Sequence, residues 1–179
     1  MILMIVFIGL LGILFGLGYM YIVEKSDGTS KGKVYEWISK KPWVQTPFGA
    51  GLTLLLGNFL IFSTVVISYF IIMLFHIPFA HLFLIFLGTW LSIMFWILMK
   101  QIWFHKIKTQ RIFMSLVGSS FYLLLFLFTL FQYWRLEPTS PNDDIFMAAL
   151  GMLILTVVSF TAFIICFLIT GITKKVVAK

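Results

Sequence analysis

The sequence predicts an all-α integral membrane protein in which residues 1–179 form a single transmembrane helical domain. Three observations lead to this fold class. Hydrophobic residues make up 61% of the chain and charged residues only 11%, whereas about 25% of the residues of a soluble domain are charged. Five apolar stretches are long enough to cross roughly 30 Å of hydrocarbon as helices. None of these stretches contains a Lys, Arg, Asp or Glu.

The predicted transmembrane helices follow one another with short connections. They span about residues 2–22, 48–74, 79–99, 112–133 and 145–172. The first stretch occupies the position of a secretory signal peptide. However, it lacks a basic segment before its apolar run, and no cleavage site of small residues follows it. We therefore expect the first stretch to remain in the protein as a helix.

Lysine and arginine residues are concentrated in every second connection between the predicted spans and in the C-terminal tail. Twelve of them fall on one side of the membrane: Lys25, Lys31, Lys33, Lys40, Lys41, Lys100, Lys106, Lys108, Arg111, Lys174, Lys175 and Lys179. The other side carries only Arg135. Because inner connections are enriched in Lys and Arg, this pattern predicts an N-terminus outside and a C-terminus on the cytoplasmic or matrix side of a cell or organellar membrane. Topology accounts for the positive charge, so we expect no nucleic-acid partner.

The connection after the first span contains a predicted amphipathic interfacial helix over about residues 31–41. Its apolar face consists of Val34, Trp37 and Ile38. Its charged face consists of Lys33, Glu36 and Lys40. Such a helix lies in the plane of the membrane interface, near anionic lipid headgroups. The residues expected to contact the inner lipid surface or a partner are Lys33, Trp37, Lys40 and Lys41. The alternative interpretation is a solvated loop with a chance periodicity.

Each predicted span carries one stripe of small or polar residues among Leu, Ile, Phe and Val. On the second span the stripe consists of Thr53, Gly57, Thr64 and Ser68, with Asn58 beside them. The simplest interpretation is that the stripes pack against one another or against partner helices. Alternatively, some of them line a cavity for a lipid, quinone or similar ligand. The candidate ligand-binding residues are then Asn58, Thr64, Ser92, Ser119 and Tyr122.

The spans and turns contain few residues that could bind a ligand, hold a metal ion or catalyse a reaction. Asn58 is the most costly polar group within a span, so we expect it to have a hydrogen-bonding partner. His76 and His81 bracket a turn and are weak candidates for a metal site, although interfacial side chains are the simpler interpretation. Cys166 lies in an apolar run without an activating base, which predicts an inert thiol. We therefore predict no enzyme activity, no cofactor and no metal.

Two functions from different classes are compatible with this pattern. The one we favour is a non-catalytic multi-pass subunit or accessory protein of a larger membrane protein complex, which packs its helices against other membrane subunits. The alternative is a small membrane protein that binds or transports a hydrophobic or amphipathic ligand. The small extramembrane mass and the lack of charged groups within the spans favour the first function.

Overall fold

The computed structural model describes residues 33–75, 80–137 and 145–172. This part of the chain is almost entirely helical, and it contains four helices that are long and apolar enough to cross a membrane. The prediction of an all-α membrane protein is therefore confirmed. The first predicted span, 2–22, lies outside the described residues.

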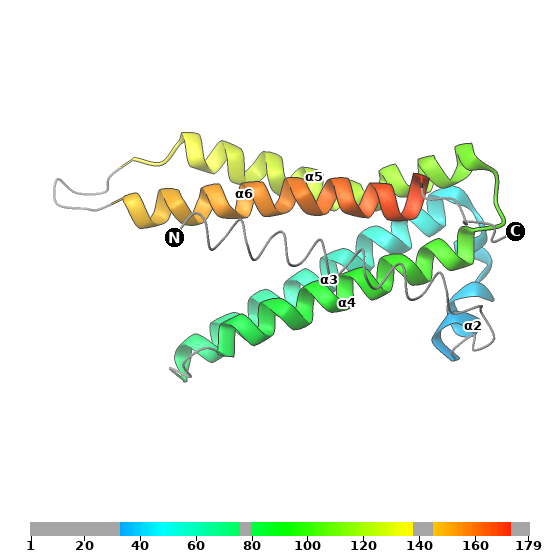
Figure 1. The fold of residues 1–179 in the computed structure, drawn as a ribbon, viewed down its shortest axis with the longest axis horizontal. Helices are drawn as coiled ribbons and strands as arrows, with labels where there is room; N and C mark the ends of the chain where they lie inside the picture. The colour runs from blue at the N-terminus through cyan, green and yellow to red at the C-terminus, as the bar shows by residue number, and fades with distance from the viewer. Residues whose placement is uncertain (1–32, 76–79, 138–144, 173–179) are drawn as a thin grey trace, which may run out of the picture.

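A short helix and a 3₁₀ turn precede the four long helices (Figure 1). The elements are α2 (Lys33–Ser39), η1 (Pro42–Gln45), α3 (Pro47–Leu74), α4 (Ala80–Trp103), α5 (Lys108–Trp134), α6 (Phe146–Phe167) and the π-helical turn η2 (Leu168–Ile172). α2 lies within the predicted amphipathic segment 31–41. α3 begins where the Thr46 hydroxyl accepts a hydrogen bond from the Gly49 amide at 3.2 Å, which is a standard helix N-cap.

Two helices extend further into the charged connections than the sequence predicted. α4 continues past Met99 to Trp103 and so includes Lys100. α5 begins at Lys108, ahead of its predicted start, and includes Arg111. The predicted boundaries stop at the last apolar residue, whereas the two helices continue beyond it into the basic connection. Backbone hydrogen bonding continues beyond them because long basic side chains reach the headgroups from within a helix.

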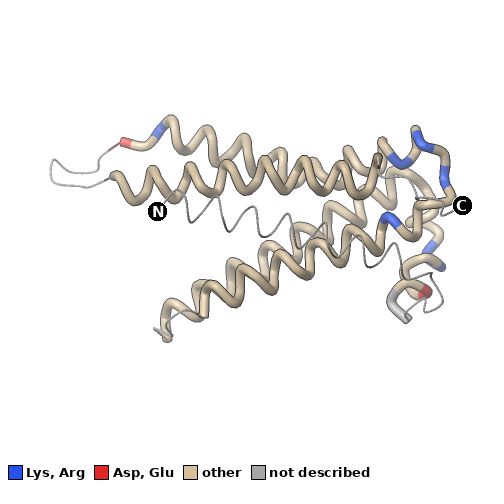
Figure 2. Tube along the Cα trace, in the orientation of Figure 1, with Lys and Arg blue, Asp and Glu red and all other residues tan. Residues whose placement is uncertain are grey.

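Charged residues divide between the two ends of the helix bundle (Figure 2). One end, called here the basic end, carries Lys40, Lys41, Lys100, Lys106 and Lys108. The opposite end carries Arg135 and Glu137. We call residues 47–60, 92–103, 108–122 and 159–172 the basic half, and residues 61–74, 80–91, 123–134 and 146–158 the opposite half.

Buried residues are concentrated in the basic half. The residues that α3 buries are Ala50, Gly51, Leu54 and Asn58, all within this half. In the opposite half, the residues that the described helices bury are Gly88, Thr129 and Thr156. The α3–α4 pair and the α5–α6 pair meet in the basic half and diverge toward the opposite end (Figure 1). The core of the described bundle therefore lies at its basic side.

The close approach of α3 and α5 depends on two glycines. A Cβ atom added to Gly51 would lie 2.7 Å from Val117 Cβ, and one added to Gly118 would lie 2.7 Å from Leu54 Cβ. Both distances are too short for a carbon–carbon contact. Small residues at a crossing let membrane helices approach closely and gain van der Waals contact. These two glycines therefore position α3 against α5.

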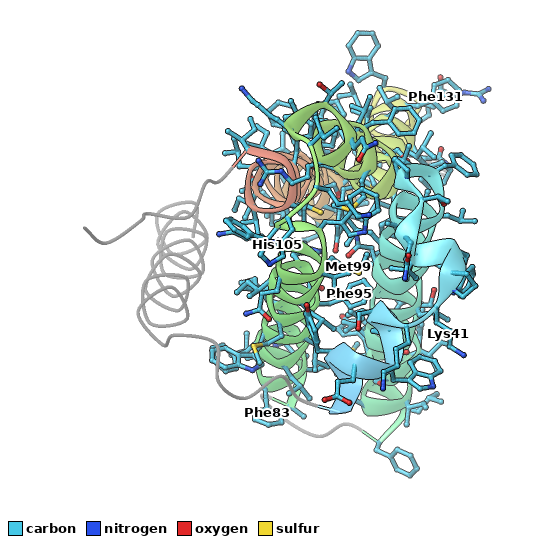
Figure 3. All side chains as sticks on the ribbon, turned by 90° about the vertical axis from the view of Figure 1, so that its right-hand side faces the viewer. Lys41, Phe83, Phe95, Met99, His105 and Phe131 are labelled. Atoms are coloured by element: carbon cyan, nitrogen blue, oxygen red, sulfur yellow. The ribbon has the colours of Figure 1, made fainter. Side chains whose placement is uncertain are left out.

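η1 and the last turn of α4 meet at the basic end. Trp103 Nε1 donates a hydrogen bond to the carbonyl oxygen of Val44 at 3.0 Å, and both residues are buried. Viewed from this end, Met99 lies among the helices, whereas Phe83 in the opposite half projects away from them (Figure 3). The 3₁₀ turn is thus attached directly to the core.

Candidate functional site: a polar junction in the basic half

Asn58 connects the four long helices at one point. Its Oδ1 accepts a hydrogen bond from Trp96 Nε1 of α4 at 2.8 Å. Its Nδ2 donates to the carbonyl oxygen of Gly118 on α5 at 3.2 Å and to Cys166 Sγ on α6 at 3.9 Å. We call these four residues the Asn58 junction. The prediction that Asn58 has a hydrogen-bonding partner is thus confirmed.

The Asn58 amide is fully buried, so the free-energy cost of its burial depends on its hydrogen-bonding partners. A polar group transferred into apolar surroundings without hydrogen bonds costs roughly 2–7 kcal/mol. In the junction, both the oxygen and the nitrogen of the amide are used. The buried Trp96 N–H, which needs an acceptor of its own, is satisfied by the same contact. The junction is therefore a self-contained polar cluster.

Tyr122 and Ser92 extend the junction along α5 and α4. The Tyr122 ring meets the Trp96 ring edge to face, with the ring centroids 5.8 Å apart. The Tyr122 hydroxyl lies near the Ser92 side chain. Both residues are buried. An aromatic pair in this geometry stabilises packing by about 0.5–1.5 kcal/mol beyond the burial of its area.

A second polar cluster joins α5 to the π-helical turn η2. Ser115 Oγ donates to the carbonyl oxygen of Phe167 at 3.0 Å, and Thr170 Oγ1 lies 2.8 Å from Ser115 Oγ. A Cβ atom on Gly171 would meet Ser115 at 3.0 Å. Unusual helical turns leave carbonyls that need partners, and here Ser115 supplies one. This cluster therefore stabilises the end of the last helix.

The candidate ligand-binding residues fall in different environments. Asn58, Ser92 and Tyr122 come together, as described above. Ser119 is buried beside them, but its hydroxyl bonds the Leu116 carbonyl of its own helix at 3.4 Å. Thr64 is exposed, and its hydroxyl bonds its own helix at 2.8 Å.

The stripe predicted for the second span is not the face that α3 buries most deeply: Gly57 packs against Phe95 of α4, whereas Thr64 is exposed. α3 instead buries the face that contains Ala50, Gly51, Leu54 and Asn58. Apolar and small residues occur on several faces of α3, so the sequence alone did not select the correct one. The partnership of Asn58 with Trp96 was likewise not predicted, although Trp96 shares a helical face with Gly88 and Ser92.

The amphipathic surface at the basic end combines an exposed tryptophan with lysines. Trp37 is 65% exposed, and Lys41 Nζ lies 4.8 Å from the centroid of its ring. Lys40 pairs with Glu36 at 3.7 Å, with both side chains largely exposed. Ile38 packs toward the core. α2 is therefore held by Ile38 while Trp37 stays accessible; the side chain of Lys33 lies outside the described residues.

The histidines and the cysteine are separated in space. His81 is partly exposed near the start of α4, and His105 is exposed after its end. His76 lies outside the described residues. Within the described ranges, no group of three or more His, Cys, Asp or Glu side chains gathers in a way that would hold a metal ion. Cys166 is fully buried in the Asn58 junction.

An open hollow lies at the basic end, where α3 and α5 begin. It measures about 360 Å³, and its lining residues are Thr46, Pro47, Phe48, Thr109, Gln110 and Phe113. The hollow is separate from the Asn58 junction. No protein family, curated protein or solved structure matches this chain.

Proposed function

We propose that this chain is a non-catalytic multi-pass subunit or accessory protein of a larger membrane protein complex. The observation that carries the proposal is the contrast between the two halves of the bundle. In the opposite half, the described helices bury very few side chains against one another. Large apolar side chains there, such as Phe70, Phe83 and Phe131, are more than half exposed. Partner helices would supply the contacts that these faces lack.

A glycine on α6 supports the same proposal. A Cβ atom on Gly151 would meet nothing within 4 Å, and Met147, one turn earlier, is 68% exposed. Glycine within a helix costs about 1 kcal/mol relative to alanine. No contact among the described residues requires this glycine. Small residues on the face of a membrane helix are typical of helix–helix interfaces, so we assign the face around Gly151 to a partner.

The proposed orientation follows from the distribution of charge. We place the basic end on the cytoplasmic or matrix side, with the N-terminus outside and the C-terminus inside. The lysines at that end and the positive-inside rule support this orientation. In this orientation Trp37 and Lys41 lie at the inner interface, where they would contact anionic headgroups or a partner.

Site-specific photo-crosslinking tests the proposal in the native membrane. A photoreactive phenylalanine at Met147 samples the α6 face, and the same residue at Leu116 is a control. Leu116 is also about half exposed but lies in the basic half. We expect a protein adduct of defined mass from position 147 and little from position 116. Adducts only with lipid at both positions would contradict the proposal, and a link to residues 2–22 of the same chain would assign the face to the first predicted span.

Native mass spectrometry of the protein from its own membrane in mild detergent provides an independent test. A stable mass that contains other subunits supports the proposal. A lone 20.7 kDa species with a bound small molecule contradicts it. That second outcome favours the alternative, a binding or transport protein for a hydrophobic or amphipathic ligand.

One observation favours the alternative function enough to test it. Three candidate residues, Asn58, Ser92 and Tyr122, gather from three different helices. A ligand would have to open the hydrogen bond between Asn58 and Trp96. Replacement Tyr122→Phe removes one hydroxyl and keeps the ring, so a carrier should lose its bound amphiphile while it remains folded. Retention of the same bound mass by Tyr122→Phe would exclude this group from a ligand site.

A further inference from the structure

Arg111 is a buried cation without a counter-charge among the described residues. It lies in the first turn of α5, it is 8% exposed, and its Nε is buried without a hydrogen-bond acceptor. The acidic residues of the described chain are Glu36, which pairs with Lys40, and Glu137, which lies at the opposite end. A buried guanidinium is costly unless an anion accompanies it.

The helix terminus beside Arg111 also lacks a partner. Ile107 occupies the N-cap position of α5 and offers no side-chain acceptor. The amide of Arg111 bonds the Ile107 carbonyl at 3.1 Å, but the amides of the preceding turn receive no side-chain cap. Arg111 belongs to this first turn, so its side chain and the uncapped amides are at the same end of α5. Both features favour negative charge at the same place.

We propose that Arg111 and the first turn of α5 bind a phosphate group, and that this phosphate belongs to an anionic phospholipid. A guanidinium presents two parallel N–H groups that match phosphate oxygens. Helix N-termini bind phosphate through free amides. Lys108 lies in the same turn, but its side chain is exposed, so it is outside the proposed site. The site lies at the basic end of the membrane spans, which is the depth of the lipid headgroups. It is distinct from the α2 surface and independent of the proposed partner interface.

The test compares two variants that remove the same charge from the same helical turn. Arg111→Gln removes the buried guanidinium, whereas Lys108→Gln removes an exposed ammonium. The full chain in detergent is offered phosphatidylglycerol or phosphatidylcholine, and bound lipid and Tm are measured by native mass spectrometry and thermal melting. We expect the wild type to prefer phosphatidylglycerol by about tenfold, Arg111→Gln to lose that preference, and Lys108→Gln to keep it.

Several outcomes would overturn the proposal. One is a wild type that does not distinguish the two lipids, as expected if a carboxylate outside the described residues, such as Glu24 or Asp27, neutralises Arg111. Another is an equal loss in both variants, which would indicate diffuse surface charge. If Arg111→Gln does not fold, Arg111→Lys replaces it: a several-fold weaker preference supports the proposal, and an unchanged preference overturns it. If inorganic phosphate stabilises the protein but phosphatidylglycerol is not retained, the site binds phosphate, and the proposal that the phosphate belongs to a lipid is overturned.

Discussion

The two halves of the bundle use the same kinds of residue in different ways. In the basic half, Asn58 bonds across to other helices, and Ser115 and Thr170 bond each other. In the opposite half, the exposed hydroxyls of Thr64 and Thr89 bond carbonyls of their own helices. A hydroxyl within a membrane helix can always satisfy itself on its own backbone. A polar residue in a membrane span therefore does not by itself indicate a helix contact.

The difference between the halves comes from where the helices cross. Gly51 and Gly118 bring α3 and α5 together at one level, and the polar junction forms beside that crossing. Further along, the two helix pairs diverge (Figure 1). One pair of hydroxyls, Thr129 and Thr156, still joins α5 to α6 there at 3.0 Å. The basic half thus holds the fold, and the opposite half is available for other contacts.

The largest effect is expected from closing the α3–α5 crossing. Replacement Gly118→Val places atoms where Leu54 stands, so we expect a loss of about 3 kcal/mol in the free energy of unfolding. The matched change Gly151→Val enlarges a glycine in open space in the opposite half and should cost far less. The free energy of unfolding in mixed micelles measures both. Equal losses would show that the crossing does not control stability.

The next effect tests the polar junction directly. Replacement Asn58→Leu leaves the buried Trp96 N–H without an acceptor, and we expect a loss of about 2 kcal/mol. Thr64→Val on the same helix is the control, because its hydroxyl is exposed and bonds only its own helix. The same unfolding measurement, followed by tryptophan fluorescence, compares the two. If the leucine variant were as stable as the control, the junction would contribute no net stability.

A smaller effect with the reverse sign is expected at the exposed glycine of the opposite half. Replacement Gly151→Ala should stabilise the purified chain by up to about 1 kcal/mol, because alanine favours the helix and meets no neighbour. The same variant should reduce the yield of the native complex if this face meets a partner. Destabilisation of the isolated chain would show that Gly151 already packs within the protein.

The smallest effect concerns the hydroxyl pair of the opposite half. Replacement Thr156→Val removes its hydrogen bond with Thr129, and interhelical bonds of this kind contribute about 0.6 kcal/mol in membrane proteins. Thr161→Val on the same helix removes a hydroxyl that bonds only Val157, so its stability should stay closer to the wild type. A loss at Thr156 as large as that of Asn58→Leu would remove the distinction between the halves.

The candidate site was predictable only in part. Asn58, Ser92 and Tyr122 were recognisable as polar or amphipathic residues within apolar spans, and the structure brings them together. Thr64 carries the same signal but is exposed. Arg111 was assigned to a connection because charge ended the apolar run, yet it belongs to α5 and is buried. Residue type indicates the cost of burial, but not whether the residue is buried.

The membrane environment and the approximate positions of the four described spans were predictable from the amino-acid sequence. The transfer of a segment into a bilayer depends on a sum over its own residues, so hydropathy and length suffice. Three features became clear only from the packed helices: which face of α3 is buried, how Asn58 contacts Trp96, and how far α4 and α5 extend. Those features depend on the rotation and crossing of helices that lie far apart in the chain. Where several faces of a helix are apolar, helix packing selects among them.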